Sequence, residues 1–186
     1  MDDAAALNLG LLLLRGIVGV VMLAHGYNHV FNGGKIPGTA RWFESLGMKP
    51  GILHAWTASL TELGAGTLLV LGLLTPLAAA GVVGTMLVAF ITNHRKNGFF
   101  IFRPGEGYEY VLTLTVVALA VAMLGAGEWS LDHALELDLA GERGVAIGLL
   151  GIGVGIATLV TFWRPDKPAP ASAESLGGES VTPKAS

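Results

Sequence analysis

Residues 9–31 form an apolar segment long enough to cross a lipid bilayer, which takes about 20 residues of helix. The segment nevertheless contains Arg15, His25 and His29. Written as heptads, these three side chains fall on one stripe, as on a seam that faces neighbouring helices. A charged side chain that faces lipid is costly, so such residues normally face the interior of a helix bundle and find partners there. The sequence therefore predicts a bundle of membrane helices with a polar interior.

Four more apolar segments follow, and together the five predict an all-α, polytopic transmembrane helix bundle with four core helices plus a fifth C-terminal span. Of the 186 residues, 52% are hydrophobic and only 13% are charged, which is typical of proteins with several membrane spans. The predicted spans are residues 9–31, 52–74, 77–93, 108–124 and 144–163, which form a bundle of residues 1–164. The remaining residues, 165–186, are rich in Pro, Ala, Ser and Glu and predict a disordered cytoplasmic tail.

The distribution of positive charge predicts the orientation of the bundle. Lys and Arg gather in the loops after the first and third spans and in the C-terminal tail, whereas the other side has Arg143 and several acids. By the positive-inside rule, the N-terminus lies outside and the C-terminus is cytoplasmic. The acidic start and the length of the first apolar run favour an uncleaved first helix over a signal peptide.

Two segments on the predicted cytoplasmic side carry aromatic residues. The first, residues 39–47, predicts a short interfacial helix with Thr39 as its N-cap and Gly47 at its end. The second is the loop of residues 94–107, which has polar ends and an aromatic centre at residues 99–102. This loop either dips into the membrane interface or forms a lid over the mouth of the bundle, and the sequence leaves both open.

The ionisable side chains lie at a series of depths below the predicted cytoplasmic surface. At 1.5 Å of rise per residue, His29 and Glu109 lie within about 5 Å of that surface, His25 roughly 9 Å deep, Glu62 about 16 Å and Arg15 about 24 Å. Arg15 has a long side chain that can extend along its helix, which predicts a buried pair with Glu62. Such a pair either fixes helix register alone or belongs to a proton relay or substrate site.

Redox cofactors and metals have few candidate ligands in this chain. His25 and His29 have the i, i+4 spacing of two ligands to one metal ion, but no complete ligand set lies at their depth, so we expect no metal site. The chain has no cysteine, which excludes thiolate metal sites and cysteine-held iron–sulfur clusters within it. Because no flavin or nicotinamide motif is recognisable, redox chemistry would need a bound cofactor such as a quinone, or a partner protein.

The fifth span contains two pairs of glycines at GxxxG spacing, formed by Gly144, Gly148, Gly151 and Gly155. This spacing lets two helix backbones approach closely. The glycines predict either docking of the span on its own bundle or a homo-oligomer that forms through them.

The order and spacing of these segments resemble those of the DoxX family of small bacterial integral membrane proteins. The resemblance covers roughly residues 9–132 and rests on LLLRGIVGVVMLAHGYNHVF, SLTELGAGTLLVLGLLTPLAA, and NGFF followed by GYEY. It implies a four-helix bundle in the bacterial plasma membrane and a role in membrane redox chemistry, since relatives include a subunit of thiosulfate:quinone oxidoreductase. The family's motif residues correspond here to Arg15, His25, Glu62, Asn97 and Glu109.

We therefore expect a subunit of a membrane oxidoreductase system that handles a quinone or another lipid-soluble molecule. Its polar cavity would be formed by six side chains, Arg15, His25, His29, Glu62, Asn97 and Glu109. Of these, His25 and Glu109 would bond the quinone oxygens, and residues 99–102 would cover the ligand. The alternatives are a small transporter or proton path, and a non-catalytic scaffold for a partner oxidoreductase. The sequence names no catalytic residue and predicts no nucleic-acid partner.

Overall fold

The computed structural model describes residues 1–137 and 139–165, and this part of the chain is helical throughout its regular structure. The helices are α1 (Asp3–Phe31), α2 (Lys35–Ser45), α3 (Gly51–Leu71), α4 (Thr75–Ala89), α5 (Glu109–Leu124), α6 (Leu131–Ala134) and α7 (Gly141–Phe162). The prediction of an all-α bundle is confirmed. The predicted disordered tail lies, except for Pro165, outside the described residues.

Each predicted span has a helix in its place. Three helical stretches are long and apolar enough to cross a membrane: Asp3–Phe31, Thr75–Asn97 and Gly141–Phe162. The middle one is α4 continued by a π-helical turn, Phe90–His94, and a 3-10 turn, Arg95–Asn97. α3 has 21 residues, and α5 is a shorter apolar helix of 16 residues.

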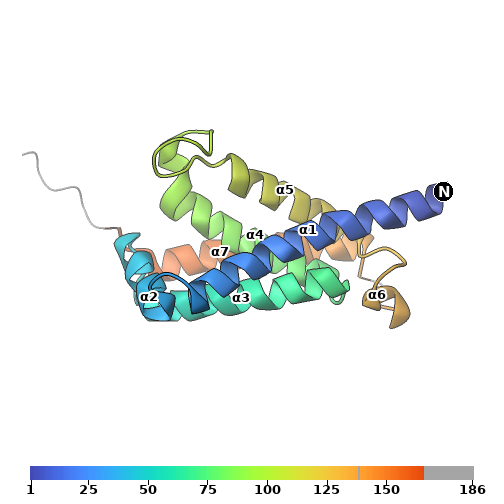
Figure 1. Ribbon diagram of the computed structural model, residues 1–186, viewed down its shortest axis with the longest axis horizontal. Coiled ribbons are helices and arrows are strands. Elements are labelled where there is room, and N and C mark those ends of the chain that lie inside the picture. The colour runs from blue at the N-terminus through green and yellow to red at the C-terminus, as the bar shows by residue number, and fades with distance from the viewer. Residues whose placement is uncertain (138, 166–186) are drawn as a thin grey trace, which may run out of the picture.

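The helices run side by side along the long axis of the molecule (Figure 1). α1, α3, α4 and α5 form a four-helix unit, and α7 packs on α4 and α5. At one end, here named the α2 end, lie α2, the loop of residues 98–108 and the last turn of α7. At the opposite end, named the α6 end, lie the N-terminus, the turn of residues 72–74 and α6.

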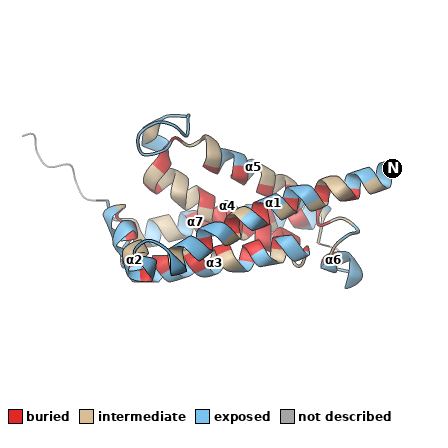
Figure 2. Ribbon diagram, in the orientation of Figure 1, coloured by how far each residue is buried: buried red, intermediate tan, exposed pale blue. Residues whose placement is uncertain are grey.

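The outer surface of the bundle is apolar. Buried residues gather on the inner faces of the helices, while their outer faces are exposed (Figure 2). Those outer faces carry large apolar side chains, among them Leu13 at 62% exposed, Ile17 at 60% and Val160 at 72%. Contiguous apolar surface of this kind marks a region that contacts lipid or protein. The long apolar helices and this surface identify a multi-pass membrane protein.

The short helix at the α2 end begins earlier than the sequence predicts. α2 starts at Lys35, with Gly34 as its N-cap, so Thr39 lies inside the helix and the prediction of Thr39 as N-cap is wrong. The Thr39 hydroxyl instead donates to the backbone carbonyl of His29, at 3.2 Å. This contact holds α2 against the end of α1, where the polar side chains of the bundle lie.

Glycines set the spacing of three helix pairs, α1 with α3 and α7 with both α4 and α5. A Cβ placed at Gly19 of α1 would lie 2.8 Å from the Gly66 carbonyl oxygen of α3, and a Cβ at Gly66 would lie 2.7 Å from the Gly19 oxygen. In α7, Cβ atoms at Gly144 and Gly151 would lie 1.9 Å and 2.2 Å from carbonyl oxygens of α5 and α4, respectively. Only glycine permits these approaches.

The four glycines of α7 are therefore used within the chain. Gly144, Gly148, Gly151 and Gly155 are all buried against α4 and α5. Docking of the fifth span on its own bundle is thus the correct alternative. The face of α7 that carries these glycines is covered by the chain's own helices, whereas the homo-oligomer stays a prediction.

Arg15 holds the α6 end together and does not pair with Glu62. Its guanidinium is 2% exposed and donates to the carbonyls of Leu69, at 2.8 Å, and Val70, at 2.6 Å, and also to that of Trp129. The first two carbonyls lie in the last turn of α3, where a cation is favoured by the helix dipole, and the Leu69 carbonyl also accepts from the Gly72 N–H at 3.2 Å. The predicted Arg15–Glu62 pair is wrong, because Glu62 lies two turns back along α3 and these nearer acceptors use the guanidinium.

Asp132 completes the same region from the connection between α5 and α7. Its carboxylate is 5% exposed and accepts hydrogen bonds from the backbone N–H groups of Leu74, at 2.6 Å, and Thr75, at 2.9 Å. It thereby satisfies N–H groups at the start of α4. Nearby, the Asn8 amide donates to the Glu128 carboxylate at 2.8 Å, which ties α1 to the same connection. The α6 end is therefore closed by several buried polar contacts.

The glycine contacts of α7 predict a difference between two substitutions that are two residues apart and lie on opposite faces of the helix. Gly151→Ala should lower the melting temperature in mild detergent, because the new methyl group would lie 2.2 Å from the Ala80 oxygen and force the helices apart. Gly153→Ala is the matched control, since nothing lies within 4 Å of its Cβ position. It should leave stability unchanged or raise it by up to about 1 kcal/mol through helix propensity. Equal melting temperatures for the two variants would contradict the docking of α7.

Arg15→Met should destabilise the protein strongly, by an amount on the order of 2–5 kcal/mol, because it leaves buried acceptors unpaired. The measurement is thermal or denaturant unfolding in mild detergent. Arg103→Met is the control, because Arg103 is an exposed residue of the loop at the α2 end. If Arg15→Met unfolds at the same point as Arg103→Met, the guanidinium does not hold the α6 end.

Candidate functional site

A cavity of about 1140 Å³ opens at the α2 end of the bundle. All the long helices line it, together with α2. Most of its wall consists of apolar and small side chains, and ionisable side chains gather in its inner part. The five that matter for the argument below are His25, His29, Glu62, His94 and Tyr110.

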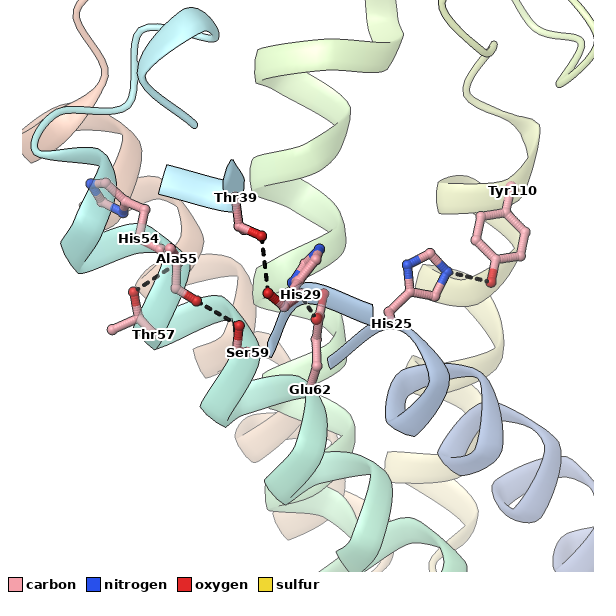
Figure 3. Close-up of polar contacts among 9 residues, drawn as sticks. All are labelled: His25, His29, Thr39, His54, Ala55, Thr57, Ser59, Glu62 and Tyr110. Carbon is pink, nitrogen blue, oxygen red and sulfur yellow. Dashed lines mark hydrogen bonds and ion pairs between the residues drawn. The ribbon is translucent and has the colours of Figure 1, made fainter. Parts of the chain in front are cut away.

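His29 of α1 and Glu62 of α3 form a buried pair in this cavity. His29 Nδ1 lies 3.0 Å from Glu62 Oε2, and Glu62 is 4% exposed. Figure 3 shows the two side chains pointing toward each other between the helices. Neither atom has an aligned hydrogen-bond partner among the described residues, so their contact is an ion pair when His29 is protonated. The close approach of the helices depends on Gly26, whose Cβ would lie 2.8 Å from Leu63 Cγ.

His25 points to a different partner. Its Nε2 lies 3.5 Å from the Tyr110 hydroxyl of α5, and the two rings are stacked with centroids 6.1 Å apart (Figure 3). Tyr110 lines the cavity as well. Although His25 and His29 are one turn apart, their contacts diverge to α5 and α3. In the described residues, no three His, Asp or Glu side chains come close enough to hold a metal ion.

The structure brings together half of the predicted site. His25, His29 and Glu62 line the main cavity, whereas Arg15 lies at the α6 end. Asn97 organises the loop at the α2 end, since its amide donates to the carbonyls of Asn93 and Glu106 at 3.1 Å and 3.0 Å. Glu109 lines a smaller hollow of about 380 Å³, which shares Ile101 and Tyr110 with the main cavity. The predicted role of Glu109 beside His25 at one ligand is therefore not supported by their positions.

The loop of residues 98–108 is closed on itself and does not cover the main cavity. Its ends are joined by backbone hydrogen bonds from Tyr108 to Gly98, at 3.0 Å, and from Glu109 to Phe99, at 2.9 Å. Its aromatic side chains lie on the outside, with Phe102 at 79% exposed. Of residues 99–102, only Ile101 lines the main cavity. The prediction that the aromatic centre of this loop covers the ligand is wrong, and its exposed rings suit the membrane interface.

Two further histidines, which sequence reasoning did not assign to the cavity, also line it. His54 of α3 is 5% exposed, with its ring between those of Phe43 and Phe162, at 6.1 Å and 5.0 Å. His94 is 9% exposed, and its Nδ1 lies 3.0 Å from the Glu106 carbonyl. Depth along the helix places both near the surface but does not show which way they face. For His94 the direction is set by the π-helical turn, which changes the helical register and has no clear sequence pattern.

Comparison with known proteins identifies the family. A family model described as DoxX matches residues 10–95. The protein named "Putative oxidoreductase CatD" of Bacillus subtilis (strain 168) is 33% identical over 113 residues, which are 61% of this chain and 78% of that relative. No solved structure matches the chain. The matching segment, this relative and the four-helix unit together show that the chain is a member of the DoxX family of membrane proteins.

Proposed function

We propose that the chain is a subunit of a membrane oxidoreductase system and that its main cavity holds the head group of a quinone-like molecule against His29 and Glu62. The proposal rests on the His29–Glu62 pair, whose two residues line an otherwise mostly apolar cavity inside a membrane protein. Intramembrane ionisable residues that face a cavity mark substrate sites or proton paths. The name of the Bacillus relative, which describes an oxidoreductase, favours redox chemistry.

The pair has the hydrogen-bonding groups that both redox forms of a quinone need. An imidazole N–H donates to a quinone carbonyl oxygen, and a carboxylate accepts from a hydroquinone hydroxyl. His29 Nδ1 and Glu62 Oε2 face each other at 3.0 Å without an aligned hydrogen bond among the described residues, so a ligand oxygen beside the pair would add a hydrogen bond to a polar group inside a mostly apolar cavity. The Tyr110 hydroxyl and His25 provide a second polar position on the same cavity.

Electrons would have to reach such a quinone from outside this chain. The chain has no cysteine, and the described residues offer no cluster for a metal. A partner oxidoreductase or another bound cofactor would therefore supply them. The chain's own residues would bind and orient the head group and exchange its protons.

We further propose that the α2 end faces the cytoplasm of a bacterial plasma membrane. α2, the loop of residues 98–108 and the end of α7 lie at this end (Figure 1). In or directly beside these segments in the sequence are Lys35, Arg41, Lys49, Arg95, Lys96, Arg103 and Arg164. The positive-inside rule assigns such an end to the cytoplasmic side. The cavity mouth would then open on that side of the membrane.

Binding of a short-chain benzoquinone tests the head-group site. The purified protein should bind it, and Glu62→Gln or the volume-matched double variant His29→Gln, Glu62→Gln should weaken binding about tenfold or more, the loss of roughly one good hydrogen bond. His133→Gln, an exposed histidine of α6 at the opposite end, should bind like the parent. Binding can be followed by calorimetry or by the shift in melting temperature. If saturating quinone neither binds nor shifts that temperature, while a stoichiometric enzyme purifies with the protein, the scaffold interpretation replaces this one.

Single cysteines test the orientation, because the parent chain contains none and gives no background. Ser45→Cys, at an exposed position of α2, should be protected from a membrane-impermeant maleimide in intact cells and react after lysis. His133→Cys, on α6, should react in intact cells, because it would lie outside. The reverse labelling pattern would place the cavity mouth on the outer side.

A further inference from the structure

We propose that the main cavity continues into a lateral groove that holds the apolar tail of the ligand, so that the ligand enters from the bilayer. The groove, named here the tail groove, lies between α3 and α7 over α4, and it belongs to the same continuous cavity as His29 and Glu62. This inference rests on the proposed head-group site and extends it to a long-chain, lipid-dissolved quinone.

The floor of the tail groove is one face of α4. Leu77, Gly81 and Thr85 recur at intervals of four residues, so they form a single stripe, and all three line the cavity. α3 and α4 are close where the turn of residues 72–74 joins them and diverge toward the α2 end (Figure 1). Near the narrow end, a Cβ at Gly81 would lie 3.3 Å from the Thr61 methyl group. The space between the two helices therefore widens from near contact to an open cavity.

The walls of the tail groove are two further stripes. Thr57 and Thr61 stand on α3, and Leu150, Val154 and Thr158 stand on α7, again at intervals of four residues. The hydroxyls of Thr57 and Thr158 donate to carbonyls of their own helices, at 2.6 Å and 2.9 Å, so they present methyl groups rather than free donors. These walls carry no charge. From Leu150 to the end of α7, the stripe runs for about 18 Å at 1.5 Å per residue.

The shape and surroundings of the groove favour a flexible apolar chain as its occupant. Leu150 is 65% exposed and Val154 is 64% exposed, so the outer wall borders the surface that faces lipid. A helix of a second copy would be about 10–12 Å wide, which a slot that narrows to near contact at Gly81 does not admit. A chain of methylene or isoprenoid units fits such a slot. Its head group would lie beside the His29–Glu62 pair, since Glu62 directly follows Thr61 of the wall, and its apolar chain would run along the stripe of α7.

A photoreactive quinone tests the tail groove directly. The probe is a benzoquinone with a ten-carbon tail that ends in a diazirine, added to the full-length protein in phospholipid nanodiscs. After irradiation, mass spectrometry should find the label on α3 and α7 residues of the tail groove. Excess unmodified quinone with the same tail should reduce this label at least tenfold.

A bulky substitution on the floor provides the matched comparison. Thr85→Phe should reduce groove labelling at least tenfold, yet leave binding of the short-chain benzoquinone within twofold of the parent, because the head-group site is untouched. Val116→Phe is the control, since Val116 is a 57% exposed residue of α5 outside the cavity, and it should change neither measurement. If Thr85→Phe lowers the melting temperature, Thr85→Leu takes its place, with a smaller effect in the same direction.

The experiments distinguish a failure of the tail groove from a failure of the head-group site. Labels on α5 or on the loop of residues 98–108, with short-chain binding intact, would overturn the tail groove and leave the head-group site standing. If excess phospholipid removes the groove labelling and excess quinone does not, the groove binds membrane lipid and the inference is overturned. If the parent does not bind the short-chain quinone, the head-group site falls and the tail groove falls with it.

Discussion

The last carbonyls of a helix have no helical donor, and inside a membrane they have little water to replace it. At the end of α3 this need is met by Arg15, a side chain from a different helix, which also reaches the carbonyl of Trp129. Asp132 then satisfies the N–H groups that begin α4. Together these contacts fix the end of α3, the start of α4 and the connection that leads to α7. These contacts set the distance between α3 and α4 at the α6 end, from which the two helices diverge toward the α2 end.

Separation at the α2 end is what makes room for a cavity. Around it, α1 and α3 stay in close contact through Gly19, Gly26 and Gly66, so the His29–Glu62 pair is held at 3.0 Å between two helices that cannot readily move apart. α4 diverges from α3 and leaves the space into which the pair opens. The same fold therefore places rigidity at the polar pair and open volume beside it. A site for a lipid-soluble molecule needs both, because the head group must be oriented and the chain must be accommodated.

Hydropathy and glycine spacing were sufficient to predict the fold, since long apolar segments in a bilayer have few alternatives to helices. The stripe shared by Arg15, His25 and His29 also predicted that these side chains face inward. These patterns could not predict which inward groups meet. Arg15 and Glu62 differ by only about 8 Å in estimated depth, yet the Arg15 guanidinium donates to backbone carbonyls. Every residue has such a carbonyl, so this choice of acceptor leaves no signal in the sequence. Asn97 and Glu109 were misplaced because the hydrogen bonds that close a loop on itself leave no periodic pattern, and the same holds for the π-helical turn that directs His94.

α3 and α4 are joined at the α6 end and diverge toward the α2 end, so they behave as two arms hinged at one end. When two arms are joined at one end, a small angular fluctuation at the joint becomes a larger displacement at the tips, in proportion to arm length. α3 has 21 residues, and the helical stretch that begins with α4 has 23, so each arm is about 30–35 Å long. Thermal motion is thus expected to be largest near the cavity mouth, within the limit set by the backbone hydrogen bonds from Lys49 to Phe162 and from Arg164 to Gly47, which join the start of α3 to the end of α7 there. A guest could pass in and out on such fluctuations without any helix unfolding and without breaking the contacts of Arg15.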